Sequence, residues 1–372
     1  MKQFTIPSGM RDQILGECEI KKQLQLKIES SLDKWGYKEV ITPTIEFYKT
    51  YEEGFRDIKE QDMYKFFDAQ GRILMLRADM TIPIARVVAT KFKDATTPLR
   101  FRYCANVFKV HEELSGLRNE ISECGVELIG MEEKCGDLEI LVTALEALKV
   151  VDNRKWILEI GNIAYFNEAC RLANIEGIDK EELADLINTK RMQDLNDKLS
   201  RLQLSKDQSM FFKMLPWING DVSILAEARK YAFAKELENI LDSMQSLYDD
   251  LYKLGYEDVN FDLGKAANLN YYTGIIFEAY VEGVGNKVLS GGRYDTLISR
   301  YGRNLPATGF AIKLDALLDI IEKKEEKISY KISYHPNYRV EALMKAKELQ
   351  KENTVTLCVD EKESMYRISR EG

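Results

Sequence analysis

The chain has 372 residues, of which 45% are hydrophobic and 31% charged, and its formal net charge at pH 7 is −8. Such a composition is ordinary for a globular protein, and the acidic charge argues against a protein built mainly to grip a phosphate backbone, because those proteins carry a basic stripe or domain. No run of about 18 apolar residues and no signal-peptide layout occurs, so we expect a cytoplasmic protein with one large domain and smaller attachments.

The cysteines and histidines suggest no metal chemistry. Six cysteines are scattered without a CxxC pair, and we expect all of them to be reduced thiols. The two histidines, His111 and His335, belong to no HExxH motif or Cys/His cluster, so we expect no zinc site and no other metal or cofactor.

The first third of the chain alternates between helix and strand patterns. After Gly16, an apolar stripe of Ile20, Leu24, Ile28 and Leu32 predicts a helix that ends near Gly36. A strand over 37–43, broken by Pro43, should follow, then a buried strand over 73–76 and a helix over 82–90. Strands over 101–108 and 124–130 flank the polar loop 110–119, which predicts an antiparallel pair.

The middle of the chain reads as helices and the remainder as strands. Helical patterns fill about 161–256, with leucine stripes that include 237–254, and strands are predicted over 259–263, 275–281 and 287–290. A helix carrying Leu314, Leu317, Leu318 and Ile321 should follow 308–312. The charged run 323–327 resembles a linker, and about 45 residues after it suggest strand, helix (340–351), strand (354–359) and tail. The fold class is therefore α+β.

Six segments, in order, resemble motifs of the class II aminoacyl-tRNA synthetases, in particular the histidyl branch. They are the helix and strand up to Pro43 (motif 1), 76–81 LRADMT (LRPEGT in the family), 108–127 (motif 2), 268–274 NLNYYTG (RGLDYYTG), 291–295 GGRYD and 309–311 GFA (motif 3). The resemblance covers Pro7 to Leu318. It implies an antiparallel sheet flanked by helices in a core domain of residues 1–322, with a helical insertion at about 161–256, and a short C-terminal α/β segment at 328–372.

Departures from the family remove phosphate chemistry. The motif 2 arginine that contacts the α-phosphate is Lys109 here, the motif 3 arginine falls on Ala316 with Lys313 in place of an earlier glycine, and the arginine before the histidine signature falls on Ala267. Guanidinium groups stabilise developing phosphate charge in a bidentate way that alanine cannot reproduce, and one lost donor typically costs roughly 10²–10³ in rate. We therefore expect no adenylate formation and no catalytic residue.

The amino-acid site is better preserved, and the resemblance implies that it binds histidine. Carboxylates suit an ammonium group and imidazole N–H donors, and a tyrosine hydroxyl suits an imidazole nitrogen. The residues predicted to bind histidine are Asp79, Thr81, Lys109, Glu123, Glu127, Tyr271, Tyr272 and Tyr294. Simpler interpretations stay open: Tyr271 and Tyr272 could pack a strand end, Glu127 could be a solvated strand residue, Gly291-Gly292 could only form a turn, and His111 could be a surface loop residue.

A chain that has lost the phosphate-binding arginines but keeps the amino-acid site resembles the regulatory subunits of ATP phosphoribosyltransferase. The resemblance implies a non-catalytic subunit, required for the activity of a short-form catalytic subunit and for feedback inhibition by histidine in the first step of histidine biosynthesis. It also implies a homodimer through motif 1 within a hetero-oligomer. The lack of a long apolar run argues against a membrane span, and the acidic charge and the short C-terminal segment argue against a tRNA partner. Two alternatives remain: a divergent histidyl-tRNA synthetase, and a synthetase-like amino-acid-sensing paralogue in another pathway.

Overall fold

The computed structural model describes residues 5–54, 60–111, 117–151, 154–265, 271–318, 320–321 and 329–371. The chain forms two compact units, Met1–Ile321 and Glu322–Gly372. Among the described residues, no helix combines the length and apolar character needed to cross a bilayer.

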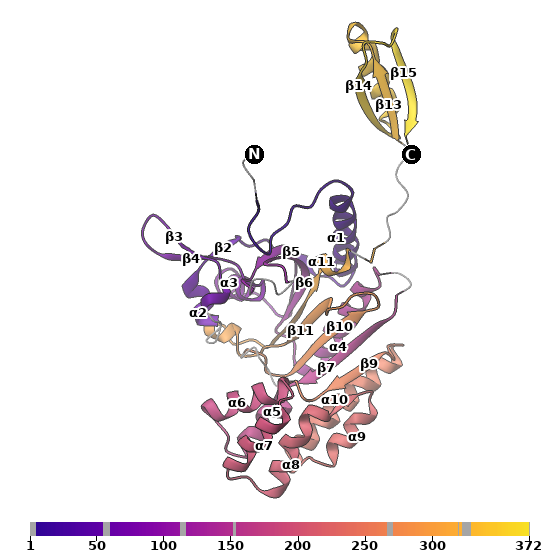
Figure 1. Ribbon diagram of the computed structural model, residues 1–372. Coiled ribbons are helices and arrows are strands. Elements are labelled where there is room, and N and C mark those ends of the chain that lie inside the picture. The colour runs from indigo at the N-terminus through magenta and orange to yellow at the C-terminus, as the bar shows by residue number, and fades with distance from the viewer. Residues whose placement is uncertain are drawn as a thin grey trace. The chain divides into compact units, whose positions relative to one another are not determined.

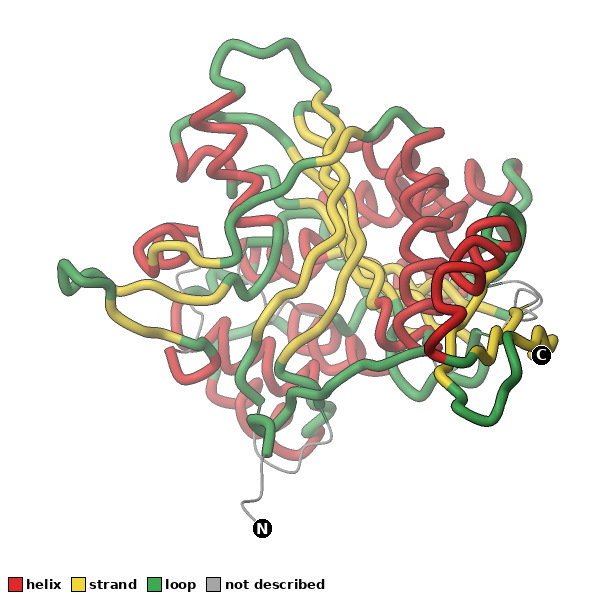
Figure 2. Tube along the Cα trace, turned by 90° about the horizontal axis from the view of Figure 1, so that it is seen from above, coloured by secondary structure: helices red, strands yellow, loops and turns green. Residues whose placement is uncertain are grey.

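One nine-stranded sheet organises the first unit, and Figure 2 shows its strands side by side in a twisted layer. In spatial order the strands are β1 (Lys38–Glu39), β5 (Leu99–Phe108), β6 (Glu120–Ile129), β12 (Ala307–Lys313), β11 (Leu289–Arg293), β10 (Ile275–Val281), β7 (Trp156–Asn162), β9 (Val259–Asp262) and β8 (Asn219–Gly220). Neighbours pair antiparallel except β1 with β5 and β7 with β9, which are parallel. The predicted fold class and the antiparallel pairing of β5 with β6 are confirmed.

Helices cover one face of this sheet and form the main core with it. The predicted stripe on α1 (Gly16–Lys34) is confirmed, because Leu24, Ile28 and Leu32 are buried there. Beside it lies α4 (Glu133–Leu148), whose apolar residues surround the helix, so that no stripe marked it in the sequence. Strand β10 shows the matching alternation, with Ile275, Phe277, Ala279 and Val281 all buried.

The opposite face is covered near β5 by α2 (Tyr48–Gly54) and α3 (Thr81–Lys91), which confirms the helix predicted over 82–90. A small sheet of β2 (Ile45–Phe47), β4 (Ile73–Leu76) and β3 (Lys65–Phe67) lies in the same part of the chain. The strand expected over 73–76 exists, but the expectation that it is buried is wrong for Ile73, which is 42% exposed, because β4 belongs to this small sheet and only Met75 reaches the core.

Six helices follow β7: α5 (Ile163–Leu172), α6 (Gly177–Asn188), α7 (Met192–Arg201), α8 (Lys206–Met214), α9 (Ser223–Arg229) and α10 (Lys235–Lys253). Figure 1 shows them gathered at one end of the sheet. The stripe on α10 buries Leu237, Leu241, Met244 and Leu251, whereas Leu254, beyond the helix, is 56% exposed.

Motif 3 forms a longer strand and a shorter helix than expected. Residues 308–312 lie in β12, and the helix after them, α11, is described only over Leu314–Leu317. Strand β11 begins at Leu289 rather than at residue 287. The linker 323–327 lies outside the described residues.

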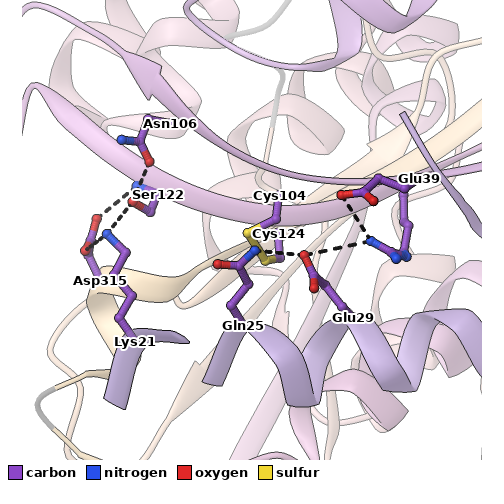
Figure 3. Close-up of a disulfide and its surroundings, with 10 residues drawn as sticks. Lys21, Gln25, Glu29, Glu39, Cys104, Asn106, Ser122, Cys124 and Asp315 are labelled. Atoms are coloured by element: carbon purple, nitrogen blue, oxygen red, sulfur yellow. Dashed lines mark hydrogen bonds and ion pairs between the residues drawn. A yellow bond between two sulfur atoms is a disulfide. The ribbon is translucent and has the colours of Figure 1, made fainter. Parts of the chain in front are cut away.

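Two cysteines correct the expectation of free thiols. Cys104 and Cys124 stand directly opposite each other on β5 and β6 and form a disulfide. Figure 3 shows it above Gln25 of α1, between a polar group of Lys21, Asp315, Ser122 and Asn106 and another that includes Glu29 and Glu39. Nineteen residues separate the two cysteines in the sequence, so only the strand register reveals the pairing.

The second unit is a small α/β element. Strand β13 (Ser329–Tyr334) lies between β14 (Thr354–Val359), which is parallel to it, and β15 (Tyr366–Glu371), which is antiparallel. Helix α12 (Arg339–Leu349) packs Ala342 and Ala346 against Ile332. The predicted strand, helix and strand are all present, and the expected tail is a third strand.

Candidate functional site

The predicted site residues of β6 lie on the sheet face opposite the main helices. In the strand register, Glu127 stands between Phe101 on β5 and Gly309 on β12, and the same cross-strand row continues to Gly292 on β11. A Cβ at Gly309 would overlap the Glu127 Oε2 atom, and one at Gly292 would stand 2.7 Å from the Tyr272 ring. The two glycines are therefore required for these side chains to lie against the sheet. Gly291-Gly292 is part of strand β11 and not a turn.

Glu127 is buried and held by two hydroxyl groups. Thr81 donates through Oγ1 to Oε1 of Glu127 at 2.8 Å, and the Tyr294 hydroxyl donates to Oε2. Burial raises the pKa of Glu127 to about 8, against the lowering effect of these two hydrogen bonds. The alternative that Glu127 is a solvated strand residue is wrong, since only 1% of it is exposed.

Asp79 and Thr81 reach the same place from the turn that leads into α3. The buried Arg77 anchors that turn by donating to the backbone oxygens of Asn106 at 2.8 Å and Thr42 at 2.9 Å. Tyr51 holds the residues of this turn that follow Arg77, because the Tyr51 hydroxyl donates to the Asp79 backbone oxygen at 2.9 Å. The Asp79 side chain accepts from the Ile82 amide at 2.9 Å, and burial raises its pKa to about 6.

Four tyrosines complete the arrangement. The rings of Tyr271 and Tyr272 lie 4.5 Å apart between centroids, and Tyr271 meets Tyr294 edge-on at 5.9 Å. Tyr103 of β5 was missed in the sequence; its hydroxyl lies over Gly125, where an added Cβ would come within 2.5 Å of it. Burial raises the pKa of Tyr103, Tyr271 and Tyr294 well above the usual value, so these hydroxyls stay neutral. We refer to Asp79, Thr81, Tyr103, Glu127, Tyr271, Tyr272 and Tyr294 as the carboxylate–tyrosine cluster.

A second group lies farther along the same face and consists of Lys109, Glu123 and Lys313, the lysine–glutamate group. Glu123 of β6 stands opposite Lys313 of β12. Burial raises the pKa of Glu123, and the charges of Lys109 and Lys313 partly offset this. Within the described part of the chain, none of these three side chains has an ion-pair partner within 4.0 Å.

The eight predicted residues therefore lie at one end of a single face. Direct bonds join Thr81, Glu127 and Tyr294, ring contacts join the tyrosines, and Asp79, Glu123 and Lys109 influence one another through their charges. Buried carboxyls among neutral hydroxyls suit a small ligand that offers N–H donors or an ammonium group.

Two of the three positions that carry the family's phosphate-binding arginines can also be located. Lys109 is exposed just after β5, and Ala316 lies in α11, packed against the core. Ala267 and the first residues of the signature, 268–270, lie outside the described residues. His111 is half-exposed in the motif 2 loop, where its backbone amide donates to Asn119 Oδ1 at 3.0 Å, in keeping with a loop residue.

Comparisons with known proteins agree with the geometry. The family model described as "Histidyl-tRNA synthetase" matches residues 9–317. An ATP phosphoribosyltransferase regulatory subunit of Clostridium novyi is 38% identical over 324 residues, covering 86% of this chain and 77% of that protein. The corresponding protein of Clostridium kluyveri is 36% identical over 94% of this chain and 92% of its own. A solved ATP phosphoribosyltransferase regulatory subunit/histidyl-tRNA synthetase from Bacillus halodurans C has a TM-score of 0.86 at 31% identity, covering 97% and 94% of the two chains.

Proposed function

The chain belongs to the family of ATP phosphoribosyltransferase regulatory subunits, which share the histidyl-tRNA synthetase fold, and we propose that it is a non-catalytic, histidine-responsive member. Histidine binds in the carboxylate–tyrosine cluster and changes the activity of a separate short-form catalytic subunit. The complex carries out the first step of histidine biosynthesis in the cytoplasm.

One observation carries this proposal: the Glu127 carboxyl is buried and bonded to Thr81 and Tyr294, and no cation pairs with it among the described residues. An imidazole ring offers the N–H donor that such a carboxyl accepts, and the flanking tyrosine hydroxyls accept or donate at its other nitrogen. Burying an incompletely bonded carboxyl is costly, so a ligand that completes its bonds binds with a corresponding gain.

Adenylate formation is not part of the proposed function. Activating an amino acid builds charge on a phosphate, and the positions that carry the family's arginines hold Lys109, Ala267 and Ala316. A single lysine supplies charge without the bidentate fork, and the alanines supply neither. We therefore propose that aminoacylation is lost and that the domain keeps only its ligand-binding role.

Control of a partner requires that histidine binding and catalysis share a coupling free energy, typically about 1–3 kcal/mol. We propose that this chain forms a homodimer through the motif 1 region, α1 and β1, and that the dimer docks in a larger hetero-oligomer with the catalytic subunit. We further propose that residues 1–322 act as the sensing domain and that 328–372 form a separate C-terminal segment.

The decisive experiment measures phosphoribosyltransferase activity of the short-form catalytic subunit, with and without this protein, across a histidine titration. We expect activation that histidine reverses. Absence of activation with the cognate subunit would refute the proposed function and favour an amino-acid-sensing paralogue. ATP–pyrophosphate exchange supported by histidine would instead identify a divergent synthetase.

A further inference from the structure

A bound amino acid presents a carboxylate as well as an ammonium group and a side chain, and the carboxylate needs a cation. The arginine that opens the family's histidine-binding signature corresponds to Ala267 here, and an alanine side chain supplies no cation. We propose that Lys313 binds the α-carboxylate of the bound histidine. The assignment rests on the proposed function and identifies how its ligand is recognised.

The strand register places Lys313 on the correct face. It stands opposite Glu123 of β6, while Gly309, four residues earlier on β12, stands opposite Glu127. Residues four apart on a strand point to the same side and lie about 13 Å apart. That distance is within the combined span of two side chains and one amino acid, so a ligand held by Glu127 at one end extends toward Glu123 and Lys313.

The surroundings of Lys313 leave its charge uncompensated. It is half-buried, and burial lowers the pKa of its ammonium group. The charged groups that act on it are the carboxylates of Glu123 and Glu278 and the ammonium groups of Lys109 and Lys287, yet no carboxylate of the described residues is within ion-pair distance. A partly desolvated cation of this kind gains most from a ligand that brings its own negative charge.

Two neighbouring lysines are less suited to the task. Lys287 is already paired with Glu278, so its charge is compensated within the chain. Lys109 is exposed, where water competes for its ammonium group. Lys313 and Glu123 together offer one cation and one carboxyl on adjacent strands, which is the complement of an amino-acid head group.

The test compares two ligands that differ only in the carboxylate, histidine and histamine, by calorimetric titration of the full chain. We expect the wild-type protein to prefer histidine by about 10–100-fold, the value of one charge-assisted contact. Lys313→Ala should lose this preference by weakening histidine alone, with histamine affinity changed by less than about threefold. Lys313→Met keeps the aliphatic stem and should behave in the same way, and Lys287→Ala should retain the preference.

Several outcomes would overturn the assignment. A preference that survives in both Lys313 variants excludes the contact, and a preference lost in Lys109→Ala but kept in Lys313→Met assigns it to Lys109. Failure of the wild-type protein to bind histidine would refute the assignment together with the proposed histidine response. Histidine binding with an intact preference in the Lys313 variants refutes the assignment alone.

Discussion

Two parts of the same sheet face differ in whether their carboxyl groups are paired with cations. Toward β7, Lys265 lies 2.5 Å from both Glu159 and Glu278, and Glu278 also pairs with Lys287; we refer to these four residues as the paired row. Burial raises the pKa of Glu278, but its bonds with the two lysines outweigh this and lower it to about 2. Toward β6, burial raises the pKa of Glu127 to about 8.

This difference in pairing distinguishes charged residues that stabilise the fold from charged residues that can bind a ligand. In the paired row each carboxylate is matched by a cation of the same chain, so the row stabilises the fold and offers little to a ligand. The carboxylate–tyrosine cluster and the lysine–glutamate group lack such matches among the described residues. Burying them without such a partner is costly, and groups with perturbed pKa values gather at functional sites. Variants of the two parts should therefore fail in different assays.

The largest expected effect is on ligand binding. Glu127→Ala removes the carboxyl that accepts from the imidazole, and we expect histidine affinity to fall by about 10²-fold or more. Isothermal titration measures the affinity. The melting temperature of the variant without ligand should not show a comparably large decrease, because the variant also removes a buried ionisable group. Unchanged histidine affinity would contradict the assignment of the cluster.

The paired row should show the reverse pattern. Lys265→Met leaves Glu159 and Glu278 facing each other without their shared cation, and we expect a loss of about 1–3 kcal/mol in the free energy of unfolding after allowance for partial exposure. Chemical denaturation measures this loss, while histidine affinity should stay within about twofold. Lys253→Ala is the matched control, because Lys253 and its partner Asp250 are both more exposed, with 72% and 38% of their side chains accessible, and the pair should be worth less than about 1 kcal/mol. A drop in histidine affinity for Lys265→Met with no loss of stability would reverse the comparison.

The smallest effect is in the pH dependence of stability, and its sign differs between the two parts. Because the pKa of Glu127 is raised from 4.5 to about 8 on folding, its contribution is full below pH 4.5 and is lost as the pH rises through 8. The melting temperature of the wild-type protein should therefore fall relative to Glu127→Gln between pH 5 and 9. Glu278 has a lowered pKa, so the advantage of the wild-type protein over Glu278→Gln should be present above pH 4.5 and disappear toward pH 2.

Calorimetric scans of the ligand-free proteins at several pH values measure both differences. Parallel slopes for the two variants would show that the two carboxyls experience the same environment, contrary to the comparison.

Local patterns were sufficient for much of the fold. The apolar stripe on α1 predicted that helix through its periodicity, and the β-branched and aromatic composition of residues 275–281 predicted β10. Helix α4 was not predicted by periodicity because it is buried on nearly all sides. The burial of β4 was misjudged because its small sheet leaves Ile73 exposed and buries only Met75 fully. The site residues could be proposed from the motifs, but Tyr103 could not, because its role depends on standing across from Gly125 on another strand.

By itself, the sequence determined the order of most elements, the class II synthetase resemblance and the loss of the arginines at 109, 267 and 316, since these are properties of residue type and spacing. The tertiary structure decided which charges are matched. Lys265 and Lys313 look alike in the sequence, yet one bridges two carboxylates and the other has no ion-pair partner among the described residues. The pairing of Cys104 with Cys124 was decided in the same way. Pairing depends on distances between strands far apart in the chain, and only the sheet register sets those distances.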